Sequence, residues 1–112
     1  MHEQPITITC YTDVLCVWAY VSQRRIDELE RQFGDRINVE YRFCGIFCDA
    51  RRKIGGGWSD RGGFEGYANH VRSVAERFDH ISISPDTWVV EPPRSSLAAH
   101  LYLRAVDLVE AD

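Results

Sequence analysis

The sequence lacks both the long apolar run of a membrane protein and the basic excess of a nucleic-acid-binding protein. No stretch approaches the roughly 20 consecutive apolar residues that a transmembrane helix needs. Lys and Arg number 13 against 17 Asp and Glu, which gives a formal net charge of -4, whereas proteins that bind phosphate backbones present a basic face. We therefore expect no nucleic acid and no membrane as a partner.

An export signal is also missing, because the opening MHEQPITIT has neither the basic segment nor the apolar core of a signal peptide. The four cysteines are Cys10, Cys16, Cys44 and Cys48. They would suit two disulfides in a secreted protein, but without an export signal we expect reduced thiols and a cytoplasmic protein. A length of 112 residues and a hydrophobic share of 45% suit one folded domain.

Residues 1–43 have the pattern of a β-α-β unit. Alternating β-branched and aromatic residues predict a strand over 5–12, and helical spacing from Val17 predicts a helix that Gly34 ends. A second alternating run, INVEYRF, predicts a strand over 37–43. Two strands joined by one helix are expected to be parallel, with their carboxyl ends at the same edge of the sheet.

Residues 44–66 hold most of the eight glycines and predict a flexible loop. The segment lacks the Gly-Lys-Ser/Thr ending of a phosphate-binding P-loop, so we interpret it as a connection rather than a nucleotide site.

Residues 67–112 form the predicted helical segment. One helix extends over 64–79, and a last helix follows the break at Pro92-Pro93, with Ser95 or Ser96 as its cap. The apolar stripes of these helices are Tyr67, Val71, Val74 and Phe78 in the first and Leu97, Leu101, Ala105 and Leu108 in the second.

Cys16 stands where the first strand gives way to the first helix. A thiol at a helix amino terminus faces unpaired N–H groups and the positive end of the helix dipole, and both favour the nucleophilic thiolate. The alternative is a small buried side chain, because free cysteine is among the most buried residue types. Cys10 alternates with Ile6 and Ile8 in the first strand, and we expect it to pack there.

The stretch from Asp13 to Tyr20, DVLCVWAY, resembles the motif D-x-x-C-P-W-C-Y of the DsbA-like branch of the thioredoxin superfamily. Further segments resemble one bacterial DsbA-type group, so the resemblance covers most of the chain. These segments are YRFCGIF, Gly57-Trp58, GYANHVRSVAERF and PPRSSLAAHLYLRAV.

The resemblance implies an α/β fold in which a thioredoxin-like β-α-β unit precedes the helices of a DsbA-type helical insertion. It also implies a thiol-disulfide oxidoreductase with Cys16 as the catalytic residue and Val17, Trp18 and Ala19 as its supporting shell. We expect Trp18 both to pack its helix and to shield the thiol. The expected substrate is a thiol or disulfide, on a protein or on glutathione.

Two positions depart from the family motif. Val17 stands where the family has proline, and Ala19 stands where it has the second cysteine, which releases the product from the mixed disulfide. The remaining candidates for a resolving thiol are Cys44 and Cys48, because they follow the second strand at the edge of the sheet expected to hold Cys16.

A single thiol leaves two further functions open. The resemblance extends to kappa-class glutathione transferases and hydroxychromene-carboxylate isomerases, which would use glutathione as a co-substrate without another cofactor. The other alternative is an interaction domain that kept the fold and lost the activity.

No metal site is expected, because Cys44-x3-Cys48 has no second compact ligand pair. The histidines are widely separated, at His2, His70, His80 and His100. We expect His70 and His100 to be satisfied residues beside apolar stripes rather than general bases.

The carboxyl-terminal half of a thioredoxin core, with its cis-proline loop, is not visible before Asp112, and neither Pro85 nor Pro92 is followed by a β-hairpin pattern. A two-stranded sheet would leave edges uncovered. We therefore expect either the amino-terminal part of a longer chain or a homodimer that completes the fold.

Overall fold

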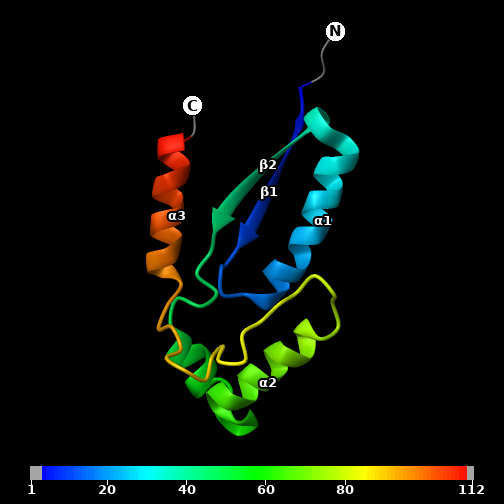
Figure 1. Ribbon diagram of the computed structural model, residues 1–112. Helices are drawn as coiled ribbons and strands as arrows, with labels where there is room; N and C mark the ends of the chain where they lie inside the picture. The colour runs from blue at the N-terminus through cyan, green and yellow to red at the C-terminus, as the bar shows by residue number, and fades with distance from the viewer. Residues whose placement is uncertain (1–3, 111–112) are drawn as a thin grey trace.

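The computed structural model describes residues 4–110, so His2 lies outside the described residues. The main elements are strand β1 (Ile6–Thr12), helix α1 (Val17–Phe33), strand β2 (Ile37–Phe43), helix α2 (Gly63–Ala75) and helix α3 (Leu97–Glu110) (Figure 1). Shorter helical segments are Gly34–Arg36, Arg51–Gly56 and Ser59–Arg61.

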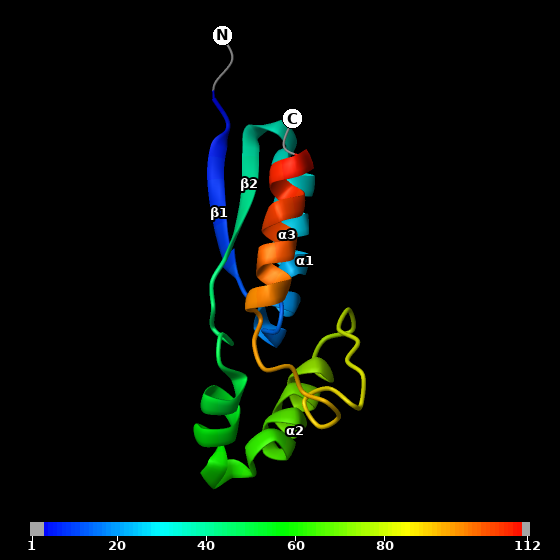
Figure 2. The same cartoon turned by 90° about the vertical axis from the view of Figure 1, so that its left-hand side faces the viewer.

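The predicted β-α-β unit is confirmed. β1 and β2 form a two-stranded parallel sheet, with register from Ile6 opposite Ile37 to Thr12 opposite Phe43. α1 ends at Phe33, and the following Gly34 has φ 51° and ψ -124°, a positive-φ conformation that glycine adopts without strain but that is not the left-handed helical one. α3 and α1 flank the strands in the view of Figure 1, and both helices lie to the same side of β1 and β2 in the view of Figure 2. The chain is therefore mixed α/β.

The predicted flexible loop over residues 44–66 is wrong, because this segment is mostly helical and supplies part of the core. Phe47, Ala50 and Ile54 are each at most 2% exposed. Their spacing, i, i+3 and i+7, is helical, and the surrounding glycines obscured this signal. The other buried core residues come from α1, α2 and the segment before α3: Val17, Val21, Tyr67, Ala68, Val71, Val74 and Trp88.

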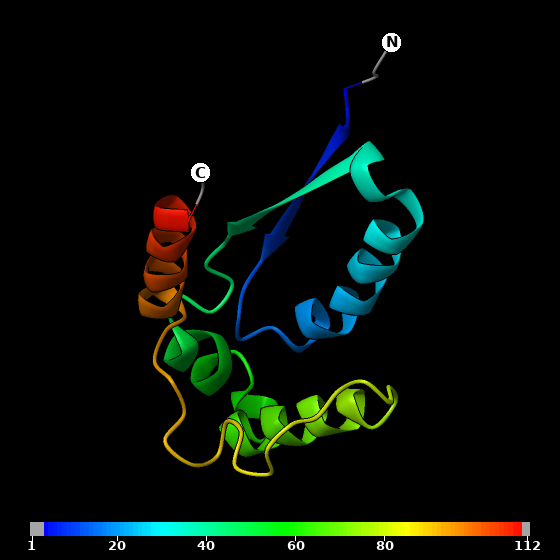
Figure 3. The same cartoon turned by 45° about the horizontal axis from the view of Figure 1, so that its top comes forward.

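Glycine serves close packing in this segment. A Cβ atom on Gly66 would lie 1.8 Å from the Arg61 carbonyl oxygen, whereas a Cβ on Gly56 would meet nothing within 4 Å. Gly66 thus lets the start of α2 approach the preceding helical turn. The segments Arg51–Gly56 and Ser59–Arg61 and helix α2 lie together beyond the carboxyl ends of both strands (Figure 3).

α3 is a helix, as predicted, but its apolar stripe does not face the core. Leu101 is 73% exposed and Leu108 is 64% exposed, and His100 is the buried residue of the helix. The Ser95 hydroxyl accepts the N–H of Leu97 at 3.1 Å and so caps the helix start. No helix within residues 4–110 combines the length and apolarity required to cross a membrane.

Candidate functional site

Cys16 occupies the predicted position at the start of α1. It is the N-cap residue, with extended backbone (φ -88°, ψ 116°), and its side chain does not cap the helix. The first turn of α1 holds no acidic residue, so no carboxylate in that turn offsets the positive end of the helix dipole. Cys16 is half-buried, which leaves its thiol open to a reaction partner.

Asp13 holds the loop that carries Cys16. The side chain is 1% exposed, and its Oδ1 accepts the Leu15 N–H at 2.9 Å. Its Oδ2 accepts the Phe47 N–H at 2.9 Å and the Ser96 hydroxyl at 2.8 Å. One buried carboxylate thus joins the loop after β1, the segment after β2 and the start of α3.

His100 supports the same loop from α3. It is 6% exposed, and its Nε2 accepts the backbone N–H of Val14 at 3.1 Å. The ring stacks on Phe43 with a centroid separation of 4.8 Å, and Nε2 lies 3.5 Å from Asp13 Oδ1. Because Nε2 accepts a hydrogen bond, the neutral ring carries its proton on Nδ1. His100 is satisfied, as predicted, but it belongs to the support of the Cys16 loop.

A cavity of about 320 Å³ opens beside Cys16. Its walls come from the start of α1, from α2 and from the segment before α3. Apart from Asp86, the lining is mainly apolar: Val14, Leu15, Val17, Tyr20, Val71, Ile83, Thr87, Trp88, Val90 and Pro93. A cavity of this size and polarity accommodates an apolar side chain or a small apolar ligand.

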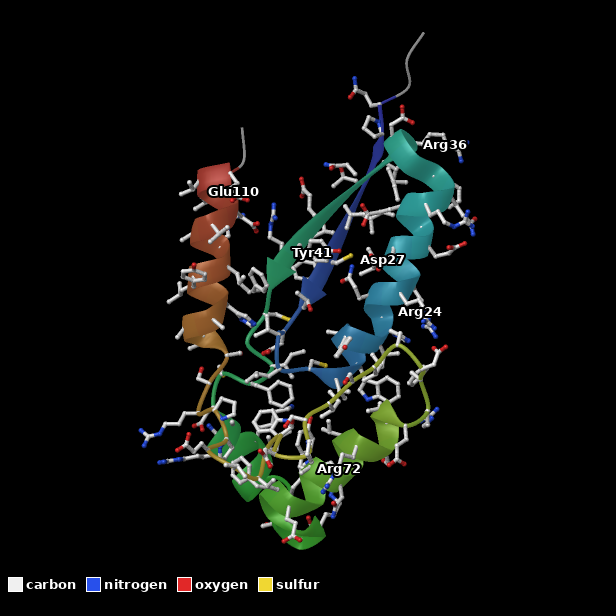
Figure 4. The ribbon with its side chains drawn as sticks, in the orientation of Figure 1. Arg24, Asp27, Arg36, Tyr41, Arg72 and Glu110 are labelled. Atoms are coloured by element: carbon white, nitrogen blue, oxygen red, sulfur yellow. The ribbon has the colours of Figure 1, made fainter. Side chains whose placement is uncertain are left out.

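A second cavity, of about 240 Å³, lies on the other side of Cys16, between α1 and the sheet. Cys10, Trp18 and Ala19 line it together with Cys16, so the small Ala19 methyl group leaves space beside the thiol. At its far wall, Gln23 Nε2 donates to the Tyr41 hydroxyl at 3.1 Å. The same amide donates to Asp27 at 2.9 Å, and Tyr41 and Asp27 lie between β2 and α1 (Figure 4).

The structure does not bring the two candidate resolving thiols into these cavities. All four cysteines are free, and neither Cys44 nor Cys48 lines a cavity that Cys16 lines. Cys44 lies against the end of β1, with its backbone N–H 2.8 Å from the Thr12 carbonyl oxygen. Cys10, which was expected only to pack in β1, is the other cysteine in the second cavity.

Trp18 both packs and stands at the surface. It is 44% exposed, its ring meets Phe78 edge-on at 6.2 Å, and the Arg77 guanidinium lies 5.8 Å from its centroid. Its indole thus lines the second cavity together with Cys16, and its contact with Phe78 joins α1 to the segment after α2.

The pKa of Tyr67 is raised by its surroundings, which include two residues of the site. Burial raises the pKa of its hydroxyl to about 12, and the negative charges of Cys16 and Asp13 add to this effect. The phenol therefore stays protonated at neutral pH.

His70 and His80 lie outside the site. His70 packs against Trp58 at a centroid separation of 5.3 Å, and His80 has a ring nitrogen 3.1 Å from the Val21 carbonyl oxygen. Within residues 4–110, no three His, Cys, Asp or Glu side chains gather as a set of metal ligands.

Sequence reasoning missed Asp13, Ser96, His100 and Asp86 as residues of the site. For Asp13 a local signal existed, because Asp often accepts the N–H two residues later before a helix. Comparison of the chain with protein-family models, curated proteins and solved structures finds no match.

Proposed function

We propose that the protein is a DsbA-type thiol-disulfide oxidoreductase that uses Cys16 as its single attacking thiol. The observation that supports this most directly is the half-buried Cys16 at the N-cap of a 17-residue helix, with a cavity on either side. The parallel β-α-β unit, with the cysteine at the carboxyl edge of the sheet, fits the amino-terminal part of a thioredoxin-like core.

The proposed reaction is thiol-disulfide exchange. The Cys16 thiolate attacks one sulfur of a disulfide R–S–S–R′, the S–S bond breaks, and R′–S⁻ leaves and takes up a proton from water. Cys16 is then joined to R by a mixed disulfide. Ala19 has no sulfur to resolve it, so a thiolate of the substrate or of a second thiol compound attacks the sulfur of R. A new disulfide with R forms, the bond to Cys16 Sγ breaks, and Cys16 leaves as the thiolate, which completes the exchange.

Asp13 and His100 are positioning residues in this proposal. They hold the backbone of residues 13–15 through hydrogen bonds to Leu15 and Val14, and the Cys16 N–H donates to the Asp13 carbonyl oxygen at 3.0 Å. The loop is therefore fixed before the substrate arrives, which limits the entropy lost in reaching the reactive geometry.

The test compares Cys16 with an exposed cysteine of the same chain. The folded protein is treated with a neutral disulfide, 2,2′-dithiodipyridine, and labelling of each cysteine is followed over time by peptide mass spectrometry. We expect Cys16 to react at least about tenfold faster than Cys48, although Cys48 is more exposed. The reason is that Cys16 stands at the positive end of the α1 dipole and lines two cavities that can receive the disulfide.

Faster labelling of Cys48, or labelling of Cys16 only after unfolding, would overturn the proposal. The Cys16→Ser variant identifies the signal that belongs to Cys16, and Cys48→Ser is the matched control. If Cys16→Ser instead keeps every cellular role of the protein, the interaction-domain alternative is supported.

A further inference from the structure

We infer that the cavity beside Cys16 selects partners whose sulfur carries an apolar or positively charged group, and disfavours anionic partners such as glutathione. Asp86 is the residue that sets this charge preference. The inference rests on the proposed function, since it names the class of substrate that the Cys16 thiol takes.

The lining of the cavity is the first observation. Of the described residues that form the 320 Å³ cavity, Asp86 is the one that is an Asp, Glu, Lys, Arg or His. Most of the others are aliphatic or aromatic, so a group next to the reacting sulfur gains from burial of its apolar surface. A positive charge on that group would also be attracted by Asp86 and by the thiolate itself.

The segment that carries Asp86 is fixed in place. Its backbone N–H donates to the Ser84 hydroxyl at 3.2 Å, and its carbonyl oxygen accepts the N–H groups of Val89 and Val90 at 3.1 and 3.0 Å. Trp88, which is 4% exposed and stacks on Phe47 at 5.5 Å, anchors this turn in the core. The position of Asp86 at the cavity is therefore set by packing.

The carboxylate of Asp86 is not neutralised by a neighbour. Within the described part of the chain, no Lys, Arg or His forms an ion pair with it. Asp86 is also exposed, so water screens its field without removing it. A cationic partner can thus meet an available negative charge.

Neither cavity beside Cys16 offers a cation. No Lys or Arg is among the described residues that line either of them. Arg77, which lies over the Trp18 ring, is not part of either lining. Glutathione carries two carboxylates and one ammonium at neutral pH, so its net negative charge would face Asp86 without a compensating cation. The formal net charge of the chain, -4, acts in the same direction.

The experiment uses methanethiosulfonates that share one leaving group and differ in the group they transfer. The Cys16 thiolate attacks the sulfenyl sulfur, methanesulfinate leaves, and a mixed disulfide with the transferred group forms. The probes carry trimethylammonium-ethyl, sulfonatoethyl, benzyl and methyl groups. Each rate at Cys16 is divided by the rate of the same probe with 2-mercaptoethanol, which removes differences in intrinsic reactivity.

We expect the normalised rates to favour trimethylammonium-ethyl over sulfonatoethyl and benzyl over methyl. In Asp86→Asn the cationic-to-anionic ratio should fall about fivefold, the size expected for one screened charge near the reacting atom. Salt at about 1 M should reduce the ratio of the parent in the same way. Asp107→Asn, which removes another exposed carboxylate, from α3, is the matched control and should leave the ratio unchanged.

An equal fall in Asp86→Asn and Asp107→Asn would show an effect of net charge and overturn the role of Asp86. If the normalised cationic-to-anionic ratio of the parent protein is 1, Cys16 discriminates no more than 2-mercaptoethanol does, and the charge preference is overturned altogether. A different outcome would overturn the proposed function and not the charge preference: Cys16 reacts with these activated probes but not with 2,2′-dithiodipyridine. Failure of Cys16 to react with either kind of reagent would overturn both.

Discussion

His100 on α3 accepts the backbone N–H of Val14 at 3.1 Å, across 86 residues of sequence. The bond connects the last helix to the loop between β1 and Cys16. α3 makes few other contacts with the core, since His100 is the buried residue of the helix. This hydrogen bond and the Ser96–Asp13 hydrogen bond therefore hold the start of α3 to the site.

Replacement of His100 by alanine should destabilise the protein and slow the reaction of Cys16. The change leaves the Val14 N–H without its acceptor. The hydrogen bond is part-buried, so we expect a cost below the about 1–3 kcal/mol of a fully buried unsatisfied group. Urea unfolding and the rate of Cys16 labelling measure the two effects. His100→Gln, which retains an acceptor oxygen, should recover part of both. Equal losses in both variants would show that His100 acts through packing alone.

Replacement of Asp13 by asparagine should lower the free energy of unfolding by about 1–3 kcal/mol, because hydrogen bonds to charged acceptors are the stronger ones. An amide nitrogen cannot accept all the bonds that the two carboxylate oxygens accept from Leu15, Phe47 and Ser96. Asp60→Asn, at a side chain that is 85% exposed, is the control and should change stability little. Similar stability of the two variants in denaturant titration would contradict the role of Asp13.

Replacement of Ala19 by cysteine should create a dithiol site. Residues 16 and 19 lie across the first turn of α1 and line the same cavity, so their Cα atoms fall within the roughly 7 Å that a disulfide allows. Titration with oxidised and reduced dithiothreitol, read by mass spectrometry, should show a disulfide between Cys16 and the introduced thiol. Ala19→Ser is the matched control. Absence of the disulfide under fully oxidising conditions would mean that the loop holds Cys16 away from the helix.

Tyr67 should ionise late and should make stability depend on alkaline pH. Its pKa is raised to about 12, by burial first and then by the charges of Cys16 and Asp13. Because the folded protein holds this proton more tightly than the unfolded chain, the stabilisation is complete below about pH 10. It is lost as pH rises from about 10 to about 12. A pH titration followed by absorbance at about 295 nm measures tyrosine ionisation, and the step at highest pH should be absent in Tyr67→Phe. A midpoint near 10 for Tyr67 would contradict the prediction.

Substitutions at Gly66 and Gly56 should have different effects on stability, because only Gly66 is closely packed. Gly66→Ala should destabilise the protein by more than about 1 kcal/mol, because its Cβ would overlap the Arg61 carbonyl oxygen. Gly56→Ala should be neutral or slightly stabilising, since its Cβ meets nothing and alanine reduces the freedom of the unfolded chain. Thermal unfolding compares the two directly. Equal effects would indicate that α2 shifts to accept a side chain at position 66.

The short-range pattern of apolar and polar residues was sufficient to predict the strands and the helix near the site. Alternation and helical spacing predicted β1, α1 and β2 nearly to the residue, and the change of period predicted Cys16 at the start of α1. The same reasoning failed in residues 44–66, where the glycines concealed the helical spacing of Phe47, Ala50 and Ile54. Glycine there permits close approach, and composition alone does not distinguish that use from flexibility.

The sequence by itself therefore determined the β-α-β unit and the place of Cys16, because both depend on neighbours within one or two turns. Only the tertiary structure decided what surrounds the thiol. Asp13 meets Phe47 and Ser96 across 34 and 83 residues, and Asp86 reaches the cavity through a turn anchored by Trp88. Tertiary packing also placed Cys10, rather than Cys44 or Cys48, in a cavity with Cys16. Such contacts arise when separate segments pack together, and local periodicity carries no information about which segments will meet.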